Sequence, residues 1–233
     1  MCTTVVDNAA RSSSPFASKQ YRKQLAKVKE AGTLSEWFHV KKGARQGCVL
    51  SPYMFNILAE MVIRETLEGL DGFQGGLQIG GKMITNLRYA DDIILLATSE
   101  AELQELVDRL DRVSRKYSLL INVDKTKVMA SDGIACHILI QNELLEQVDT
   151  FVYLGSLITE DGECTTEFST RLNRGRAIGT SLHKIRKSHN IPNSTKIRLM
   201  KAVVWPVATY GCESWTLRKN EETRLDAFEM KGR

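Results

Sequence analysis

The chain has 233 residues and 42% hydrophobic composition, enough for one large domain or two small ones with a real core. No apolar run reaches the length of a membrane span and the first thirty residues have no signal-peptide core, which argues against a membrane-embedded or secreted protein. Five scattered cysteines without a CxxC pair argue against a disulfide framework or zinc site and favour an intracellular protein.

The net charge of +4 conceals a strong segregation along the chain. Residues 1–47 carry +6, residues 48–170 carry −11, residues 171–201 carry nine Lys/Arg and no acid, and residues 202–233 balance at zero. An acidic middle followed by a dense basic block indicates a metal site or solvated face beside a surface that binds a polyanion. A basic block can also be merely solvated, and this alternative stays open.

The first 36 residues are weakly informative. Ser12-Ser13-Ser14-Pro15 is typical of a loop, and Lys19–Glu30 could form a short polar helix. We expect a loosely held end.

A glycine-flanked segment then leads into a helix. Gly43 and Gly47 flank Arg45 and Gln46, so the backbone there can pass close to a ligand, although a plain loop entering a helix would look the same. Ser51 is the expected N-cap, with Pro52 at the first helical position and the helix continuing to about Leu67. Its apolar face is formed by Met54, Phe55, Leu58, Met61 and Val62.

Two hairpins are expected next. The first, Leu77–Ile84, turns at Gly80-Gly81. In the second, two β-prone runs flank Asp91 and Asp92 as strands flank a two-residue turn. Neighbouring carboxylates beside a core favour a hard cation such as Mg²⁺, whereas the alternative is that both acids are ordinary turn residues.

The middle of the chain continues as alternating helix and strand. Ser99 and Glu102 form a capping box for an amphipathic helix that reaches about Tyr117. Leu119–Met129 resembles two short strands about a polar Asp124–Thr126 turn. Further short strands are expected at 137–140 and 151–154. Together these elements predict an α+β sheet with helices behind it.

From about Glu163 the pattern becomes helical. A basic amphipathic helix is expected through Ile185, and a second from Asn193 or Ser194 to near Pro206. Cys212–Leu217 is β-prone, and a polar helix then runs to the last residue. We expect a C-terminal truncation there.

Four motifs occur in the order found in reverse transcriptases. Gly43–Pro52 resembles that family's G-x-R-Q-G-C-x-L-S-P block, and Tyr89-Ala90-Asp91-Asp92 resembles its catalytic YxDD box. Leu120–Lys127 is similar to the block with an N-x-x-K-T core, and Tyr153-Leu154-Gly155 resembles the primer-grip Y-L-G. Each motif is weak alone, but the ordered set is specific. Within the family, the chain most resembles non-LTR retrotransposon enzymes of the RTE or BovB kind, a likeness that continues through residues 210–216.

The resemblance implies a partial right-hand polymerase palm over residues 37–158 and a helical thumb over 159–233, after a poorly matching segment 1–36. Two Mg²⁺ ions (or Mn²⁺) about 3.5–4 Å apart would activate a primer 3′-hydroxyl and stabilise the pyrophosphate leaving group. The implied partners are an RNA template, a DNA primer, their hybrid and a dNTP. The implied site residues are Asp91 and Asp92 for catalysis and metal binding, Arg45, Gln46, Gly47 and Lys125 for nucleotide and template, and Leu154 and Gly155 for the primer grip. The implied contacts to the nucleic-acid backbone are Arg171, Arg174, Arg176, Lys184, Arg186 and Lys187.

One expected part of the family pattern is not evident. The family places another metal-binding Asp on an earlier palm strand, within a D-x-x-x-A-F-D-like segment, and Asp7-Asn8-Ala9-Ala10 does not resemble it. We therefore expect the first palm strand to be missing, unless a partner chain supplies it, and the fragment to be inactive alone. We also see no endonuclease region, as in a truncated copy. The alternatives are a non-enzymatic nucleic-acid-binding relic and a metal-free structural remnant.

Overall fold

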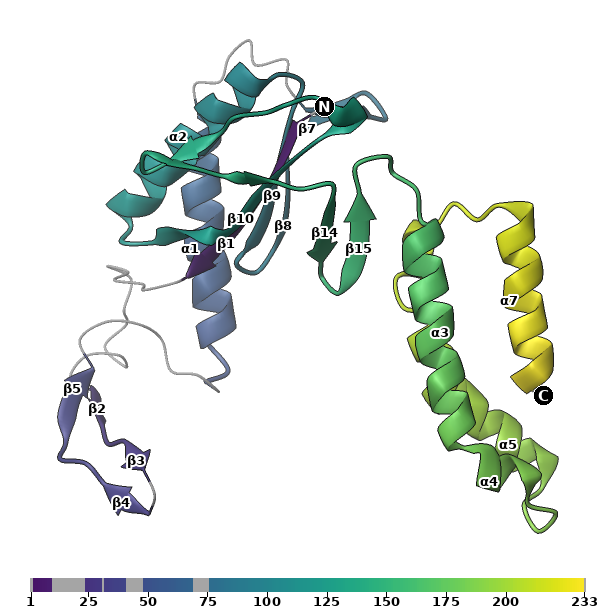
Figure 1. The fold of residues 1–233 in the computed structure, drawn as a ribbon. Helices are drawn as coiled ribbons and strands as arrows, with labels where there is room; N and C mark the ends of the chain where they lie inside the picture. The colour runs from purple at the N-terminus through teal and green to yellow at the C-terminus, as the bar shows by residue number, and fades with distance from the viewer. Residues whose placement is uncertain (1, 10–23, 31, 41–47, 69–75, 233) are drawn as a thin grey trace. The chain divides into compact units, whose positions relative to one another are not determined.

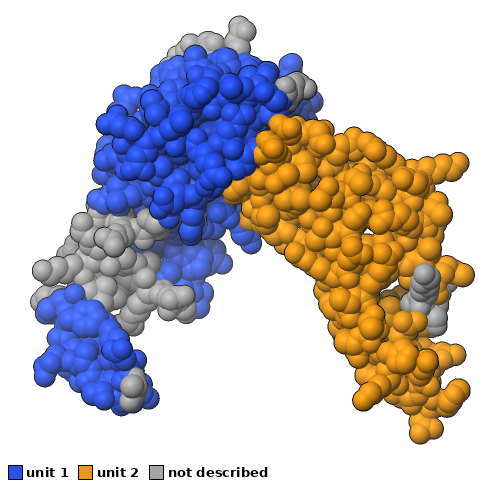
Figure 2. All heavy atoms as spheres, viewed as in Figure 1, with its two compact units in different colours: residues 1–148 blue, residues 149–233 orange. Residues whose placement is uncertain are grey.

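The computed structural model describes residues 2–9, 24–30, 32–40, 48–68 and 76–232, and of residues 2–9 it describes the backbone (Figure 1). The chain divides into two compact units, residues 1–148 and 149–233 (Figure 2). Within the described ranges, no helix combines the length and the hydropathy that crossing a bilayer would need.

The first unit is built on a five-stranded sheet with the order β13-β10-β1-β9-β8 (Figure 1). The central strand β1 pairs antiparallel with both β9 and β10, and β8 pairs with β9 as a hairpin. The edge strand β13 runs parallel to β10. The strands are β1 Cys2–Ala9, β8 Asn86–Tyr89, β9 Asp92–Ala97, β10 Leu120–Ala130 and β13 Glu146–Gln147.

The position of β1 corrects the expectation of a loosely held N-terminal end and a missing strand. Cys2–Ala9 lies between β9, the second strand of the acidic hairpin, and β10, the strand after the second helix, so the sheet needs no strand from a partner chain. Thr3, Thr4, Val5 and Val6 are β-branched residues that favour a pleated surface. The run is short, so whether it forms a strand depends on pairing with β9 and β10, which lie about 90 and about 120 residues further along the chain.

Two helices cover the sheet and close its core. Helix α2, Glu100–Lys116, packs on β9, β10 and β1, and helix α1, Ser51–Leu67, packs on α2. The apolar stripe predicted for α2 is confirmed. Buried side chains of both helices and the sheet form one cluster, which includes Leu58, Val62, Ile93, Leu95, Leu103, Leu106, Val107, Leu110, Ile121 and Val128. The mixed helix-and-strand class predicted from the sequence is therefore correct.

Of the two predicted helix N-caps, Ser99 is confirmed and Ser51 is not. The capping box is confirmed, because the Glu102 N–H donates to Ser99 Oγ at 3.3 Å. The Glu102 carboxylate reaches one residue further back than the usual box and accepts from the Thr98 hydroxyl at 2.6 Å. Ser51 is not the N-cap of α1, since Leu50 holds that position without a side-chain cap.

Among the described residues, the first unit also contains four small two-stranded hairpins and a 3₁₀ turn, Ser131–Gly133. The turn at Gly80-Gly81 is confirmed, with φ values of 57° and 79°. The described part of Lys19–Glu30 is extended rather than helical, because Gln24–Ala26 and Lys29–Glu30 pair with later strands. The hairpins are β2 Gln24–Ala26 with β5 Phe38–Val40, β3 Lys29–Glu30 with β4 Thr33–Leu34, β6 Leu77–Ile79 with β7 Lys82–Ile84, and β11 Leu139–Ile140 with β12 Glu143–Leu144.

The second unit is a hairpin followed by helices. Its core joins Phe168 and Leu172 of α3 to Val204, Ala208 and Phe228. Its elements are β14 Thr150–Tyr153, β15 Ser156–Thr159, α3 Thr165–Ser181, α4 His183–Lys187, α5 Asn193–Leu199, a π-helical turn Met200–Val204, α6 Trp205–Ala208, a 3₁₀ turn Cys212–Ser214 and α7 Lys219–Gly232.

One prediction in this unit is confirmed and another was wrong. The second helix ends near Pro206 as expected, since α6 ends at Ala208 after the π-helical turn Met200–Val204. Cys212–Ser214 forms a 3₁₀ turn rather than a strand, following Gly211 in the left-handed region at φ 74°.

Candidate active site

A row of four residues crosses one end of the sheet. In the strand registers, Asn122 of β10 lies opposite Asp7 of β1, Asp7 lies opposite Asp92 of β9, and Asp92 lies opposite Tyr89 of β8. Directly opposite residues of antiparallel strands have their Cα atoms about 4.5–5.5 Å apart. The fold therefore brings the backbone of Asp7 beside the acidic hairpin, which the sequence analysis did not foresee.

The acidic hairpin turns one residue earlier than predicted. Its two-residue turn is Ala90-Asp91, and Asp92 is already the first residue of β9, paired with Tyr89. Ala90 takes the left-handed conformation, φ 53°, which a tight hairpin turn demands and which usually falls to glycine. The two acids consequently differ: Asp91 is exposed at the tip, whereas Asp92 is half-buried and held by the sheet.

The N-x-x-K-T segment forms a bulge at the same end of the sheet. Val5 pairs with Lys127 and Asp7 with Asn122, so Val123–Thr126 lies opposite the single residue Val6. Asn122 closes this bulge twice: its side-chain oxygen accepts from the Lys125 N–H at 3.2 Å, and its carbonyl accepts from the Thr126 hydroxyl at 2.7 Å. Thr126 is fully buried, whereas Lys125 is exposed, next to the row of acids. The predicted polar turn is thus a bulge within one strand.

The donor chemistry of this row fits a divalent cation. Among the residues whose side chains are described, no three His, Cys, Asp or Glu side chains gather to hold a metal. Asp91 and Asp92 offer two carboxylates, and the register of β1 sets the backbone of a third acid, Asp7, beside them. Oxygen-only ligands of this kind suit Mg²⁺ or Mn²⁺.

The sequence signal for Asp7 was present but incomplete. Val5, Val6 and Asp7 form a short β-prone run that reaches an acid. The chain has Arg11-Ser12-Ser13 where the expected D-x-x-x-A-F-D-like segment would have A-F-D, so the sequence alone does not single out Asp7.

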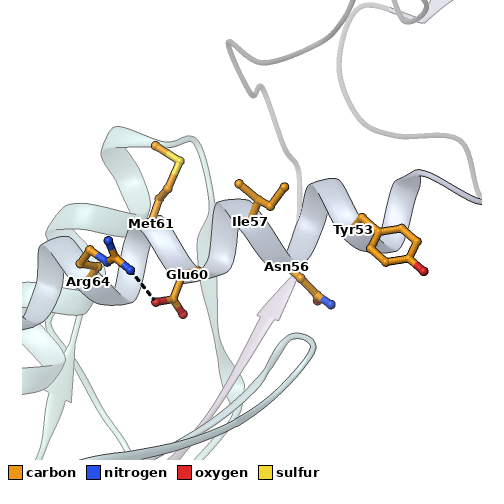
Figure 3. Close-up of a pocket in the computed structure, with 6 residues that line it drawn as sticks. All are labelled: Tyr53, Asn56, Ile57, Glu60, Met61 and Arg64. Atoms are coloured by element: carbon orange, nitrogen blue, oxygen red, sulfur yellow. Dashed lines mark hydrogen bonds and ion pairs between the residues drawn. The ribbon is translucent and has the colours of Figure 1, made fainter.

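The predicted nucleotide and template residues Arg45, Gln46 and Gly47 lie outside the described residues. The described chain resumes at Cys48, just before α1. The exposed side of α1 carries a hollow of about 410 Å³, which Figure 3 shows. Its lining is Tyr53, Asn56, Ile57, Glu60, Met61 and Arg64. One helix supplies every lining residue, and none of them belongs to the row of Asn122, Asp7, Asp92 and Tyr89. We therefore assign this hollow no part in the site.

Ion pairs fix α1 against its neighbours. Glu60 accepts from Arg88 of β8 at 2.8 Å, and this hydrogen bond lowers the pKa of the Glu60 carboxyl. Glu65 accepts from Lys116 at 2.5 Å and from the Tyr117 hydroxyl at 2.8 Å, which lowers its pKa and raises those of Lys116 and Tyr117. The Glu60 contact ties α1 to β8, the strand that leads into the acidic turn, and the Glu65 contacts tie α1 to the end of α2.

The Tyr153-Leu154-Gly155 segment is the turn of the hairpin β14–β15. Leu154 and Gly155 both lie in the left-handed region, with φ values of 49° and 83°, and Tyr153 pairs with Ser156. Two consecutive positive φ values are typical of a type I′ turn. Both residues of this turn are exposed, and their carbonyls accept hydrogen bonds from Tyr210 and Arg171.

Five of the six predicted backbone-binding cations are exposed. They are Arg174, Arg176, Lys184, Arg186 and Lys187, on α3 and α4. Arg171 corrects the prediction, since its side chain is only 9% exposed and its Nε donates to Glu167 at 2.6 Å. A cation inside the unit cannot lie along a phosphate backbone. It recurs at the helical spacing of its neighbours, so sequence reasoning could not separate it from them.

Comparisons with known proteins bear on the same region. Residues 9–158 match the family described as reverse transcriptase (RNA-dependent DNA polymerase). A transposon-derived protein of Caenorhabditis elegans is 31% identical over 170 residues, which are 67% of this chain and 58% of that protein. The Pol polyprotein of the retrotransposable element R2 from Nasonia vitripennis is 29% identical over 47% of this chain, and that of R2DM from Drosophila melanogaster is 25% identical over 74%.

This chain spans a part of those relatives' lengths, namely 58%, 10% and 16%. The named relatives include R2 elements, which agrees with a non-LTR retrotransposon origin and leaves the RTE or BovB assignment without support from them. The family match covers more than half of the chain and includes the acidic hairpin, the N-x-x-K-T bulge and the Y-L-G turn. The chain therefore belongs to the reverse transcriptase (RNA-dependent DNA polymerase) family.

Proposed function

We propose that this chain performs RNA-templated DNA synthesis, transferring a nucleotide from a dNTP to a primer 3′-hydroxyl. The observation that carries the proposal is the register that sets Asp7 opposite Asp92, with Asp91 in the adjoining turn. The expectation of inactivity rested on a missing first palm segment with its metal-binding Asp, and the strand β1, which carries Asp7, supports the opposite proposal. In this proposal residues 37–158, together with β1, form the polymerase palm, and residues 159–233 form the thumb.

In this proposal Asp7, Asp91 and Asp92 hold two divalent cations. When bound, two Mg²⁺ ions would supply Lewis-acid activation of the attacking hydroxyl and neutralise charge on the leaving pyrophosphate. The chain contributes positioning: the sheet holds Asp92, and the hairpin tip offers Asp91 to solvent. Lys125, exposed on the bulge closed by Asn122, lies on the proposed triphosphate side and would attract its negative charge.

The proposed nucleic-acid surface belongs to the second unit. The turn at Leu154 and Gly155 would contact the primer strand, and the exposed cations of α3 and α4 would follow the phosphates of the RNA–DNA hybrid. The proposed template contacts are Arg45, Gln46 and Gly47. We retain RTE- or BovB-like ancestry and an intracellular site of action as parts of the same proposal.

The test is extension of a DNA primer on an RNA template by the purified chain in Mg²⁺ or Mn²⁺. Asp92→Asn should abolish extension, whereas Asp226→Asn, an exposed acid of α7, should leave it unchanged. Extension that survives Asp92→Asn would overturn the site assignment. Salt-sensitive binding of the hybrid without any extension by the parent chain would overturn the enzymatic proposal and favour a binding relic.

A further inference from the structure

The Y-L-G turn is held by two side chains that arrive from distant parts of the second unit. The Tyr210 hydroxyl donates to the Leu154 carbonyl at 2.7 Å, and the Arg171 guanidinium donates to the Gly155 carbonyl. Arg171 lies 16 residues and Tyr210 lies 56 residues along the chain from these partners. Both carbonyls of the two-residue turn are therefore engaged.

The two side chains also support one another. The Arg171 guanidinium carbon lies 4.5 Å from the centroid of the Tyr210 ring, a cation–π contact. Glu167, one helical turn before Arg171, accepts from its Nε at 2.6 Å and orients the guanidinium. A planar guanidinium can serve the carboxylate, the carbonyl and the aromatic ring at once, which an ammonium cannot.

The chain packs closely against two glycines at this contact. A Cβ on Gly155 would lie 3.4 Å from the Tyr210 ring, and a Cβ on Gly211 would lie 2.5 Å from Ser156 Oγ. Both glycines also have positive φ, 83° and 74°. The segment at residues 210 and 211 thus touches the turn and the first residue of β15 directly.

The turn is exposed, so its two carbonyls do not need these side chains in order to be hydrogen-bonded. Leu154 and Gly155 are both accessible to solvent, where water could satisfy their carbonyls. The hydrogen bonds from the buried Arg171 and from Tyr210 restrict where the two residues of this exposed turn can move. Such restriction is useful where the turn has to hold a bound molecule in a fixed position.

From this geometry we propose that Arg171 and Tyr210 are positioning residues, which fix the Leu154–Gly155 turn so that it aligns the primer strand for attack. The inference rests on the proposed function, because it takes the turn to contact the primer. Neither residue needs to touch the primer itself. Loss of the restraint should therefore misplace the primer terminus without removing the charges that bind the duplex.

Two variants separate the parts of this restraint. Tyr210→Phe keeps the ring over Arg171 and removes the donor to Leu154, and Arg171→Lys keeps a positive charge for Glu167 and removes the planar fork. Tyr53→Phe and Arg112→Lys, both exposed in the first unit, are matched controls.

The first readout is hydrogen exchange of the amides from Tyr153 to Ser156, with and without a primer–template duplex. Tyr210→Phe should speed exchange of these amides about five-fold, the loss expected for one neutral hydrogen bond. The controls should not change it. Unchanged exchange in Tyr210→Phe would overturn the inference, whether or not the chain extends primers.

The second readout is the split between duplex affinity and the single-turnover rate of nucleotide addition. Tyr210→Phe and Arg171→Lys should slow addition about ten-fold while the duplex Kd stays within about two-fold. A Kd that weakens in proportion to the rate would overturn the inference. If the parent chain binds duplex and adds no nucleotide, the proposed function fails, and duplex protection of the Tyr153–Ser156 amides still decides whether the turn meets the primer.

Discussion

The buried ion pair of α3 gives the sharpest stability prediction. Arg171 and Glu167 have side chains only 9% and 7% exposed, and they join at 2.6 Å. Replacing Arg171 by Met would leave the Glu167 carboxylate inside the unit without its partner. Breaking a buried pair on one side costs about 3–5 kcal/mol, so Arg171→Met should lower the free energy of unfolding of the second unit by about 4 kcal/mol.

The paired replacement distinguishes this reason from lost packing. Arg171→Met combined with Glu167→Met removes both charges, and apolar residues of similar volume often replace a buried pair at little cost. The double variant should therefore recover about 2 kcal/mol or more of the single variant's loss. Arg174→Met, exposed on the same helix, should change stability by no more than about 0.5 kcal/mol.

The assay is urea denaturation followed by tryptophan fluorescence in a Trp37→Phe background. The two remaining tryptophans belong to the second unit: Trp215 lies edge-on to Phe168 at 5.6 Å, and Trp205 stacks on Phe228 at 6.3 Å. Their signals therefore report this unit's unfolding. A loss below about 1 kcal/mol for Arg171→Met, or a double variant no more stable than the single one, would refute the reasoning.

Three further predictions concern the second unit. Gly211→Ala should lower the free energy of unfolding by about 2 kcal/mol in urea denaturation, because of the positive φ and the close approach of the new Cβ to Ser156 Oγ. Adding Ser156→Ala should recover the part due to the contact and leave the part due to the backbone strain. If the double variant is no more stable than Gly211→Ala, the contact does not contribute. The Arg218 backbone N–H donates to Glu221 and lowers the pKa of its carboxyl, so the ionised carboxylate stabilises the fold above its ordinary pKa and loses that effect as the pH falls through the lowered pKa. In thermal unfolding scans, Glu221→Gln should therefore reduce the fall in melting temperature at acid pH. An unchanged fall would contradict the prediction. Lys187→Gln should reduce the slope of log K against log salt for hybrid binding by about 0.9, and an identical slope would remove Lys187 from the interface.

Sequence predictions were correct for several features that depend on residues close to one another in the chain. The Gly80-Gly81 turn and the Ser99 cap lie within a few residues of their partners, and the apolar stripe of α2 follows from helical spacing alone. Sequence patterns are informative in such cases because the interactions are local.

Apart from the local prediction of Ser51 as an N-cap, the main errors lie where distant segments decide the structure. The strand Cys2–Ala9 depends on β9 and β10, and its eight residues carry no turn signal or alternation that would reveal two partners. Arg171 shares the helical spacing of surface cations, and its burial follows from Glu167, the Gly155 carbonyl and the Tyr210 ring together. The acidic turn was displaced by one residue because Asp92 pairs with Tyr89, a register that β1 also supports.

Asp7 is the residue on which the proposed site depends most. A single-turnover measurement of one dNTP addition should compare Asp7→Asn with Asp226→Asn at equal folded fractions and saturating Mg²⁺. If Asp7 completes the carboxylate set, Asp7→Asn should slow addition by about 100-fold or more while hybrid binding persists, and Asp226→Asn should match the parent chain. Addition by Asp7→Asn at the parent rate would contradict a catalytic row built on β1 and β9.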